Sequence, residues 1–384
     1  MRNFASRVSV IGSSKIEESL KFIEQKPKII SLGAGEPDFK APKNVIEAAN
    51  KFLKKGYTHY APLQGKLELR EILSKKLKKE NKIDAGPDEI IVTNGSKEAI
   101  LLTTMTFVDP GDEVIIPDPG YLAYRPIVQM LGGVAVSLPL REENNFEIDI
   151  DELRSLVTNK TKMIIFNTPS NPTGTVFDRQ TLEDIANLLF ERNIYAMVDE
   201  AYEKLVYDDV KHVSLASLSG MSDYVVTVQS FSKTYAMCGF RLGYAVANRE
   251  IIKEMKEFKL TTTLCAPTAY QLAGVEAIKH SGKYVEKMRK EYQRRRDTLC
   301  KRLSELSDVH CIKPKGAFYV FPNIKALGMS SEEFSDFIMK NAKVVVIPGT
   351  EFGVFGEGFV RMSYATEYKK IETAMDRIEK ALKR

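Results

Sequence analysis

The chain has 384 residues and a mass of 43.3 kDa, enough for about two domains around a large core. Its formal net charge is only +5, which excludes a protein that binds nucleic acid through charge alone. No apolar run approaches the roughly 18 residues of a membrane-spanning helix, and residues 1–7 lack the apolar centre of a secretory signal. We therefore expect a cytoplasmic protein without a nucleic-acid or membrane partner.

Cysteine and histidine give no sign of a metal site. The cysteines are scattered without a C-x-x-C pair, so we expect reduced thiols that are buried as small apolar side chains. The histidines form no pair with ligand spacing, so we expect no bound metal. With so few histidines, acid–base chemistry falls to lysine, tyrosine or carboxylates. The residues concerned are Cys238, Cys265, Cys300 and Cys311, and His59, His212, His280 and His310.

Short apolar runs alternate with helical patterns through the middle of the chain. The helical patterns include 97–107 and 181–190, and Asp178 precedes the second as a candidate N-cap. This alternation predicts an open, mostly parallel α/β sheet with helices on both faces and ligands at the carboxyl ends of its strands. The seven predicted strands are Glu89–Thr93, Glu113–Pro117, Val134–Leu138, Lys162–Asn167, Ile194–Val198, Val225–Gln229 and Leu242–Val246.

The last third of the chain predicts a smaller α+β domain. A long charged helix is expected over Ser281–Leu306, and its Arg294-Arg295-Arg296 triplet is interpreted as part of a solvated face, because carboxylates are interspersed on the same helix. Three short strands follow, and a final helix begins near Glu367. The predicted strands are Ala317–Phe321, Val344–Ile347 and Phe359–Ser363.

Two further features complete the predicted organisation. Ser330 and Glu333 have the spacing of a capping box and predict a helix start. We expect a large domain over residues 42–285, and a small domain in which residues 1–41 pack with residues 286–384.

Residues that could carry chemistry follow several of the predicted strands. Val225–Gln229 is followed by Ser230, Ser232 and Lys233, and Arg241 lies eight positions further on. The amine is a candidate nucleophile, and the hydroxyls and the arginine suit a phosphate. Taken alone, Lys233 is better explained as an exposed lysine in a turn.

Two other strand ends offer an acid and an amide. Asp199, in the sequence Asp199-Glu200-Ala201-Tyr202, follows a buried strand and needs a cation unless it simply caps a helix. Asn171 lies in a stiff turn with two prolines, which either presents the amide to a ligand or is only a turn.

A fourth strand end is the loop Asn94-Gly95-Ser96-Lys97, which joins a strand to a helix and would turn free N–H groups toward an anion. It is not a Walker A loop, and residues 33–38 do not form the G-x-G-x-x-G motif of nicotinamide enzymes. Together, Gly95, Ser96, Lys97 and the residues after the Val225–Gln229 strand supply a phosphate cradle. A phosphate cradle, an amine and an acid are what pyridoxal 5'-phosphate (PLP) requires of a protein.

On these residues the chain resembles the PLP-dependent class I aminotransferases of fold type I, and within them the bacterial and archaeal aspartate/aromatic subgroup. The resemblance implies a large domain with a mostly parallel seven-stranded sheet and a smaller α+β domain. Its motifs follow the family's order along nearly the whole chain. They are Ser31–Phe39, Tyr57–Pro62, Asn171–Gly174, Asp199–Tyr202, Ser230–Lys233, Gly316–Tyr319 and Arg361–Thr366.

The resemblance also implies roles for individual residues. Lys233 would form the Schiff base and move the substrate proton, and Asp199 would pair with the pyridine nitrogen. Asn171 and Tyr202 would donate hydrogen bonds to the phenolic oxygen, and Tyr121 would stack on the ring unless it is a core residue.

Three more residues would bind substrate or join two subunits. Arg361, with the Gly35 backbone N–H, would bind the substrate α-carboxylate. Tyr60 would reach the phosphate of a neighbouring subunit, which implies a homodimer with shared sites, unless it is an ordinary surface aromatic. The segment Val8–Ile16 is predicted to form a lid over the substrate.

The implied reaction is ping-pong transfer of an amino group from an L-amino acid to a 2-oxo acid, with 2-oxoglutarate as the expected acceptor. Residues 260–267 lack the arginine that aspartate enzymes of this family use for a distal carboxylate, so aspartate, aromatic and alanine-type donors all stay open. The alternatives are a PLP-dependent β-lyase of the same fold and a non-catalytic regulator.

Overall fold

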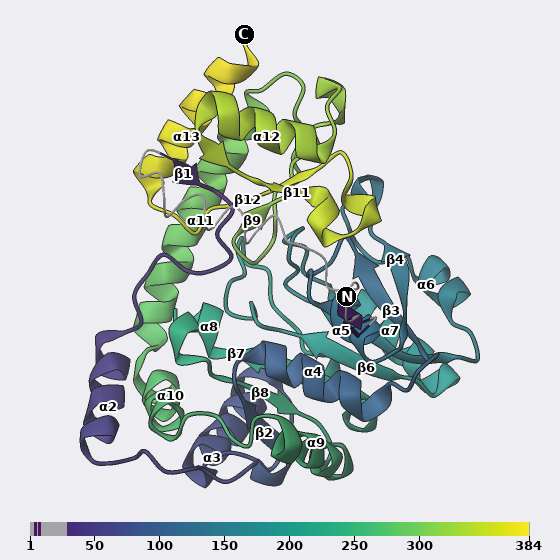
Figure 1. Ribbon diagram of the computed structural model, residues 1–384, viewed down its shortest axis with the longest axis vertical. Helices are drawn as coiled ribbons and strands as arrows, with labels where there is room; N and C mark the ends of the chain where they lie inside the picture. The colour runs from purple at the N-terminus through teal and green to yellow at the C-terminus, as the bar shows by residue number, and fades with distance from the viewer. Residues whose placement is uncertain (1–3, 6, 9–28, 384) are drawn as a thin grey trace.

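The computed structural model describes residues 4–5, 7–8 and 29–383, and it contains the seven expected strands in one sheet (Figure 1). Each strand end lies within one residue of its predicted position. The strands are β2 (Ile90–Thr93), β3 (Glu113–Asp118), β4 (Val134–Pro139), β5 (Thr161–Asn167), β6 (Tyr195–Asp199), β7 (Val225–Ser230) and β8 (Gly243–Val246).

The sheet is mostly parallel, as predicted. Its order is β2-β8-β7-β6-β5-β3-β4, and only β8 runs antiparallel to its neighbours. Because β5, β6 and β7 are parallel neighbours, their carboxyl ends meet at one edge. Asn167 at the end of β5 is paired with Asp199 at the end of β6. This edge brings the predicted acid close to the residues that follow β7.

Helices cover both faces of the sheet because successive side chains of a strand point to opposite sides. Ile164 of β5 packs in one core with α7 (Arg179–Arg192), whereas the adjacent Met163 packs in another core with α4 (Ser96–Phe107) and α9 (Arg249–Thr262). Burial on both sides explains why these strands are nearly continuous apolar runs. As predicted, Asp178 caps α7, and its carboxylate accepts the Thr181 N–H at 2.8 Å.

The C-terminal part of the chain builds a three-stranded sheet, whose strands are, in order, β11 (Ile347–Pro348), β12 (Val360–Ser363) and β9 (Tyr319–Val320). The N-terminal β1 (Ile30–Ser31) pairs with β10 (Val344–Val345), so this segment packs with the C-terminal part as expected. The predicted strand Val344–Ile347 is two strands, because β10 pairs with β1 whereas β11 pairs with β12.

Both helix signals of the C-terminal part are confirmed. Ser330 and Glu333 form the capping box at the start of α12, and α13 begins directly after Glu367. Within the described part of the chain, no helix has both the length and the apolar character to cross a bilayer. The exact domain division at residues 41/42 and 285/286 stays a prediction. The other helices are α2 (Lys43–Lys54), α3 (Leu67–Lys76), the π-helix η2 (Leu77–Asn81), α5 (Tyr124–Met130), α6 (Ile150–Leu156), α10 (Thr268–His280), α11 (Gly282–Ser304), α12 (Ser331–Ala342) and α13 (Tyr368–Leu382).

The arginine triplet of α11 does not form a solvated face, so that prediction is wrong. Arg294 is exposed, but Arg295 and Arg296 are buried. Arg295 lies 2.9 Å from a carboxylate oxygen of Asp38, and Arg296 lies 2.8 Å from one of Asp208. Consecutive residues of a helix point about 100° apart, so three in a row cannot share one face.

The prediction of buried cysteines is also wrong. All four are free thiols of intermediate exposure. Cys238 lines a cavity at the edge of the large sheet, and its Sγ lies 3.9 Å from the Lys233 amine. The small apolar character of the side chain gave no indication of this position.

Candidate active site

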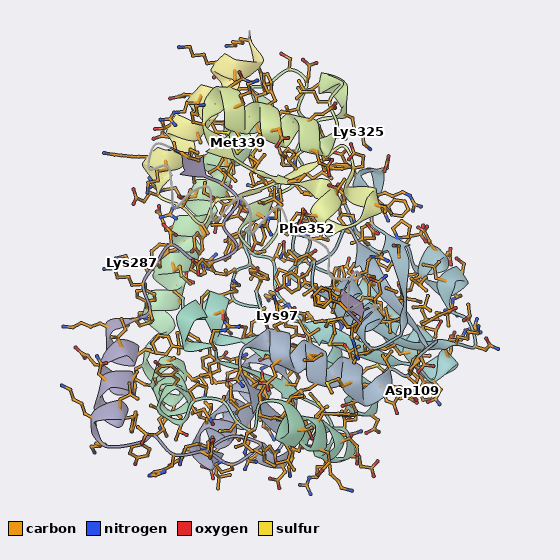
Figure 2. The ribbon with its side chains drawn as sticks, in the orientation of Figure 1. Lys97, Asp109, Lys287, Lys325, Met339 and Phe352 are labelled. Carbon is orange, nitrogen blue, oxygen red and sulfur yellow. The ribbon has the colours of Figure 1, made fainter. Side chains whose placement is uncertain are left out.

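A cavity of about 540 Å³ lies at the carboxyl edge of the large sheet. It is lined both by residues after β5, β6 and β7 and by residues of the small-sheet region. In Figure 2, Lys97, which lines the cavity at the start of α4, lies below Phe352, which follows β11 and is not itself among the described lining residues. The predicted site residues that line the cavity are Gly35, Ser96, Lys97, Tyr121, Asn171, Asp199, Tyr202, Ser230, Ser232, Lys233, Arg241 and Arg361.

Lys233 supplies the amine of the site. It lies in the short helix α8 (Phe231–Thr234), whose start is capped by the Ser230 hydroxyl oxygen accepting the Ser232 N–H. The Lys233 ammonium donates a hydrogen bond to the Gly35 carbonyl across the cavity. Burial lowers the pKa of Lys233, so a larger fraction is present as the nucleophilic neutral amine.

Asp199 supplies a buried acid. Its carboxylate accepts hydrogen bonds from the Tyr124 hydroxyl at 2.9 Å and from the Ala201 N–H at 3.1 Å. Burial raises the pKa of Asp199 to about 6, although these two hydrogen bonds act in the opposite direction. The residue therefore both caps a turn and faces the cavity. A ligand cation beside it would favour the ionised carboxylate.

An anion cradle lies at the N-terminus of α4. Gly95 is the N-cap and has φ +79°, and a Cβ at this position would lie 2.6 Å from Nη2 of Arg241. Glycine therefore lets the guanidinium approach the first turn of the helix, whose N–H groups face outward. Nη1 of Arg241 donates to the Cys238 carbonyl at 2.8 Å, which fixes the guanidinium in place. Gly95 thus shapes the cradle, although it is not itself among the described lining residues.

Arg361, on β12, is a buried cation at the opposite side of the cavity, with 2% of its surface exposed. Nη1 donates to the Asn171 side-chain oxygen at 3.0 Å, and Nη2 donates to the Gly33 carbonyl at 2.8 Å. The guanidinium lies 4.3 Å from the centre of the Tyr319 ring. Its Nε has no hydrogen-bond partner among residues 29–383 or the few described residues before them. Such a fixed cation suits a carboxylate ligand.

Tyrosines form much of the remaining wall. The hydroxyls of Tyr202 and Tyr319 lie 2.9 Å apart. Burial raises the pKa of Tyr202 well above its usual value, so the hydroxyl stays protonated and can donate to a ligand. Tyr121 also lines the cavity, and the Lys97 ammonium lies 5.9 Å from the centre of its ring.

The sequence analysis did not predict three residues of the site. They are Tyr124, which holds Asp199, Tyr319, which contacts Tyr202 and Arg361, and Cys238. Only Tyr319 carried a signal, because it ends the motif Gly316–Tyr319. Tyr124 lies in α5 among apolar residues, and a core position fully explains its pattern.

Two predicted features are not tested by this cavity. Tyr60 is 83% exposed and is not among the described residues of the lining. The predicted lid Val8–Ile16 falls, apart from Val8, outside the described residues. Neither the subunit-bridging role of Tyr60 nor the lid is tested, and both stay predictions.

The residues present fit PLP. The cradle at Gly95 and Arg241 suits a phosphate, and the Lys233 amine suits an aldehyde. The buried carboxyl of Asp199 has no basic side chain as a hydrogen-bond partner in the described part of the chain, so it suits a cationic ring nitrogen. Arg241 of the cradle, Lys233 and Asp199 all line one cavity.

The comparisons with known proteins show the family of the chain. The sequence profile described as "Aminotransferase class I and II" matches residues 27–378. The chain is 46% identical to the aspartate aminotransferase of Pyrococcus abyssi over 382 residues, which cover 99% of this chain and 98% of the relative. It is also 46% identical, with the same coverage, to aromatic-amino-acid aminotransferase 2 of Thermococcus litoralis.

A solved structure shows the same fold. The aspartate aminotransferase of Thermus thermophilus, determined with maleate, superposes with a TM-score of 0.95 at 36% identity, and the match covers 99% of this chain and 100% of that one. Fold type I and the resemblance inferred from the motifs are therefore confirmed. The chain belongs to the class I and II aminotransferase family and is itself an aminotransferase.

Proposed function

We propose that this aminotransferase holds PLP at Lys233 and moves the amino group of an L-amino acid to a 2-oxo acid in a ping-pong reaction. The observation that carries the proposal is the single cavity into which an amine, a buried acid, an anion cradle and a buried arginine all open. The class I and II aminotransferases are a PLP-using family, which supports the same cofactor.

The chain's own residues would hold PLP from several sides. The N-terminus of α4 and Arg241 bind the phosphate, and the Ser230 and Ser232 hydroxyls add donors there. Asp199 pairs with the ring nitrogen, whose positive charge keeps the carboxylate ionised. Asn171 and Tyr202 donate to the phenolic oxygen. When bound, PLP supplies an electron sink for the substrate carbanion and carries the amino group between the two half-reactions.

Arg361 and Lys233 would then act on the substrate. Arg361 binds the α-carboxylate, and its contacts with Asn171 and Gly33 fix the direction in which the guanidinium points. This orients the substrate Cα–H bond toward the Lys233 amine. In the first half-reaction Lys233 removes the proton from Cα of the donor, and in the second it returns a proton to Cα of the product amino acid. The lowered pKa of Lys233 favours this role.

The donor is proposed to include dicarboxylic amino acids, with 2-oxoglutarate as the acceptor. The relatives are named aspartate and aromatic-amino-acid aminotransferases, and the Thermus thermophilus structure was determined with maleate, a dicarboxylate. Among the described lining residues, the cations are Lys97, Lys233, Arg241 and Arg361. The last three are assigned above. The sequence analysis placed Lys97 in the phosphate cradle, but here it is proposed instead to meet a distal carboxylate, in place of the arginine absent from residues 260–267.

The working unit is proposed to be a homodimer with shared sites. Several large apolar side chains near α2 and α3 are exposed in the single chain, which supports an interface there. Tyr60 lies among them and would complete the phosphate site of the other subunit. The side chains are Ile46, Leu53, Tyr57, Tyr60 and Leu67.

The test is a half-reaction followed by absorbance. PLP-loaded protein mixed with L-aspartate alone, without any acceptor, should lose its visible absorbance and release one equivalent of oxaloacetate per site. Borohydride reduction before the donor is added should fix PLP to Lys233, and Lys97→Arg should leave that labelling unchanged. With L-cysteine in place of L-aspartate, release of sulfide, ammonia and pyruvate would instead identify a β-lyase. A label on another lysine would refute the assignment of Lys233.

A further inference from the structure

The phosphate cradle at the start of α4 lies next to a buried ion pair that the proposed reaction does not use. The pair joins Glu98, the third residue of α4, to Lys259 of α9, with 3.0 Å between the carboxylate and the ammonium. Glu98 is 8% exposed and Lys259 is fully buried. Neither is among the described residues that line the cavity, so neither is placed to contact a ligand there.

The Glu98 carboxylate holds the loop that leads into α4. Its Oε2 accepts hydrogen bonds from the backbone N–H of Asn94 and from the Asn94 side-chain amide, the latter at 3.0 Å. Asn94 directly precedes Gly95, the N-cap of α4. Glu98 therefore binds outside the helix and takes none of the first-turn N–H groups, which the cradle offers to a phosphate.

Asn94 connects this carboxylate to the guanidinium of the cradle. Its carbonyl oxygen lies 3.5 Å from Nη2 of Arg241, which donates to it. Glu98 fixes the backbone N–H and the side chain of the same residue. A chain of contacts thus runs from Lys259 through Glu98 and Asn94 to Arg241, which lines the cavity.

The C-terminal end of α9 fixes the direction of the Glu98 carboxylate. The Lys259 ammonium donates to Oε2 at 3.0 Å, and the hydroxyl of Thr263 donates to Oε1. Both carboxylate oxygens are therefore engaged. Burial lowers the pKa of Lys259 and Glu98 acts to raise it, so the charged form of this lysine depends on its partner.

The charge of Lys259 matters because the cradle binds an anion. The first-turn N–H groups and Arg241 attract a phosphate, whereas a carboxylate close to them would repel it. Lys259 is the ion-pair partner that the described residues provide for Glu98. Because the pair as a whole is neutral, Glu98 can hold Asn94 without opposing the phosphate.

We propose that Glu98 and Lys259 are positioning residues for the cofactor phosphate: Glu98 holds Asn94 and the start of α4 in the phosphate-binding geometry, and Lys259 neutralises Glu98. Both act through Asn94 and Arg241. The inference rests on the proposed function, because it concerns the cradle that is assigned there to the phosphate of PLP.

The test compares two ligands that differ only in the phosphate. The dissociation constants of PLP and of pyridoxal, which lacks the phosphate, are measured with the full-length apoprotein. The ratio of the pyridoxal constant to the PLP constant reports what the cradle contributes. In Lys259→Met this ratio should fall by about tenfold or more, the effect of one charge about 10 Å away at an effective dielectric constant near 20. The binding of pyridoxal itself should change little.

Two double variants separate the charge of Glu98 from its hydrogen bonds. Glu98→Gln with Lys259→Met is neutral and keeps an oxygen that can accept from Asn94, so the ratio should return close to the wild-type value. Glu98→Ala with Lys259→Met is equally neutral but lacks this acceptor, so its ratio should be roughly fivefold lower, the effect of about one hydrogen bond. Neither leaves a buried charge unpaired, so together they carry the test if Lys259→Met fails to fold.

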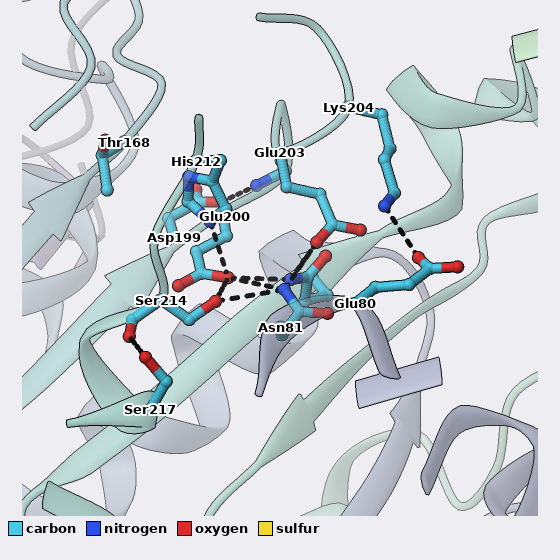
Figure 3. A network of polar contacts seen from close by, with 12 residues as sticks. Glu80, Asn81, Thr168, Asp199, Glu200, Glu203, Lys204, His212, Ser214 and Ser217 are labelled. Carbon is cyan, nitrogen blue, oxygen red and sulfur yellow. Dashed lines mark hydrogen bonds and ion pairs between the residues drawn. The ribbon is translucent and has the colours of Figure 1, made fainter. Parts of the chain in front are cut away.

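A second buried ion pair provides the matched control. It joins Lys76 to Glu203, and Figure 3 shows Glu203 in a different polar network, with Asn81 and Glu200. Lys76→Met with Glu203→Gln removes a pair of the same kind that has no contact with the cradle in the described part of the chain. It should leave the ratio unchanged. An equal fall of the ratio in this control would show a general effect of losing a buried pair and overturn the proposal.

The same measurements distinguish a failure of this inference from a failure of the proposed function. If the wild type bound PLP no more tightly than pyridoxal, the cradle would not bind a phosphate and both would be wrong. If the wild type preferred PLP and Glu98→Ala with Lys259→Met kept the full preference, only the assignment of Glu98 and Lys259 would be wrong. In that case the pair would merely join α4 to α9, and its loss would lower the free energy of unfolding without changing the ratio.

Discussion

At the scale of single residues, Asp199 is placed against its own electrostatic preference. A carboxyl group at the end of a buried strand is more stable when neutral, which is why its pKa rises to about 6. The proposed chemistry needs it ionised. The ionised Asp199 carboxylate therefore destabilises the folded apoprotein, and a bound cation beside it would offset this destabilisation.

This leads to a prediction with a defined sign. The folded-state pKa of about 6 lies above the usual 3.8, so folded protein binds protons more tightly and stability falls as pH rises from about 4 to 6. Asp199→Asn removes this loss and should stabilise the apoprotein at pH 8 by about 1–3 kcal/mol, but not at pH 3.5. Urea unfolding at the two pH values measures the difference.

The control is Asp178→Asn at the N-cap of α7. The Thr181 N–H lowers the pKa of Asp178, so its ionised form stabilises the fold and the substitution should bring no gain at pH 8. If Asp199→Asn were no more stable than the wild type at pH 8, this would contradict the prediction that the ionised Asp199 carboxylate destabilises the apoprotein.

Substitution of Lys97, also at the residue scale, tests whether its side chain binds the distal carboxylate of the substrate. Lys97→Gln should reduce kcat/KM for aspartate or glutamate by tenfold or more, since a hydrogen bond to a charged group contributes about 1.5–3 kcal/mol. Phenylalanine, which has no distal carboxylate, serves as the matched substrate and should be little affected. An equal loss for both donors together with weaker PLP binding would assign Lys97 to the phosphate cradle instead.

The residues that sequence analysis could find are those whose position in the chain already indicates a strand end. Lys233, Asp199 and Asn171 each follow an apolar run, so parallel pairing brings them to one edge. Tyr124 could not be found this way, because it looks like a core residue and no local pattern encodes its contact with Asp199.

At the scale of whole elements, α11 shows that a pattern of charged residues predicts a helix but not which of its side chains are exposed. Its bounds are predictable, because a long charged helical pattern predicts a long helix. The pattern of alternating charges was taken to mean solvation, yet Arg295 and Arg296 are buried against partners from distant segments, among them Asp38 and Asp208. The same holds for β10 and β11, since the sequence indicates extended backbone but not which strand lies beside it.

Arg294 and Arg296 form a matched pair for testing this difference. Arg296→Met should destabilise the protein by about 2 kcal/mol or more, because it removes buried hydrogen bonds to the Pro314 carbonyl and to Asp208. Arg294→Met, two positions away on the same helix, should leave the urea midpoint unchanged. Equal midpoints for the two variants would contradict the burial of Arg296.

At the scale of the whole molecule, Tyr60 is not among the described residues that line the cavity of a single chain. Its side chain is 83% exposed and lies near other exposed apolar residues of α2 and α3. A monomeric enzyme would gain nothing from such a surface, whereas a symmetric dimer would bury it twice. The proposed sharing of Tyr60 then requires that each site contain side chains of both subunits.

Mixed dimers test this directly. Two separately tagged variants, Lys233→Ala and Tyr60→Ala, are co-expressed, and the species carrying both tags is purified. In that species, one site has its own Lys233 and the other subunit's Tyr60, so about half of the wild-type activity should return. Without sharing, that site lacks Tyr60 and the other lacks Lys233, and activity would stay at or below that of Tyr60→Ala alone. A failure of the two tags to purify together would contradict the dimer itself.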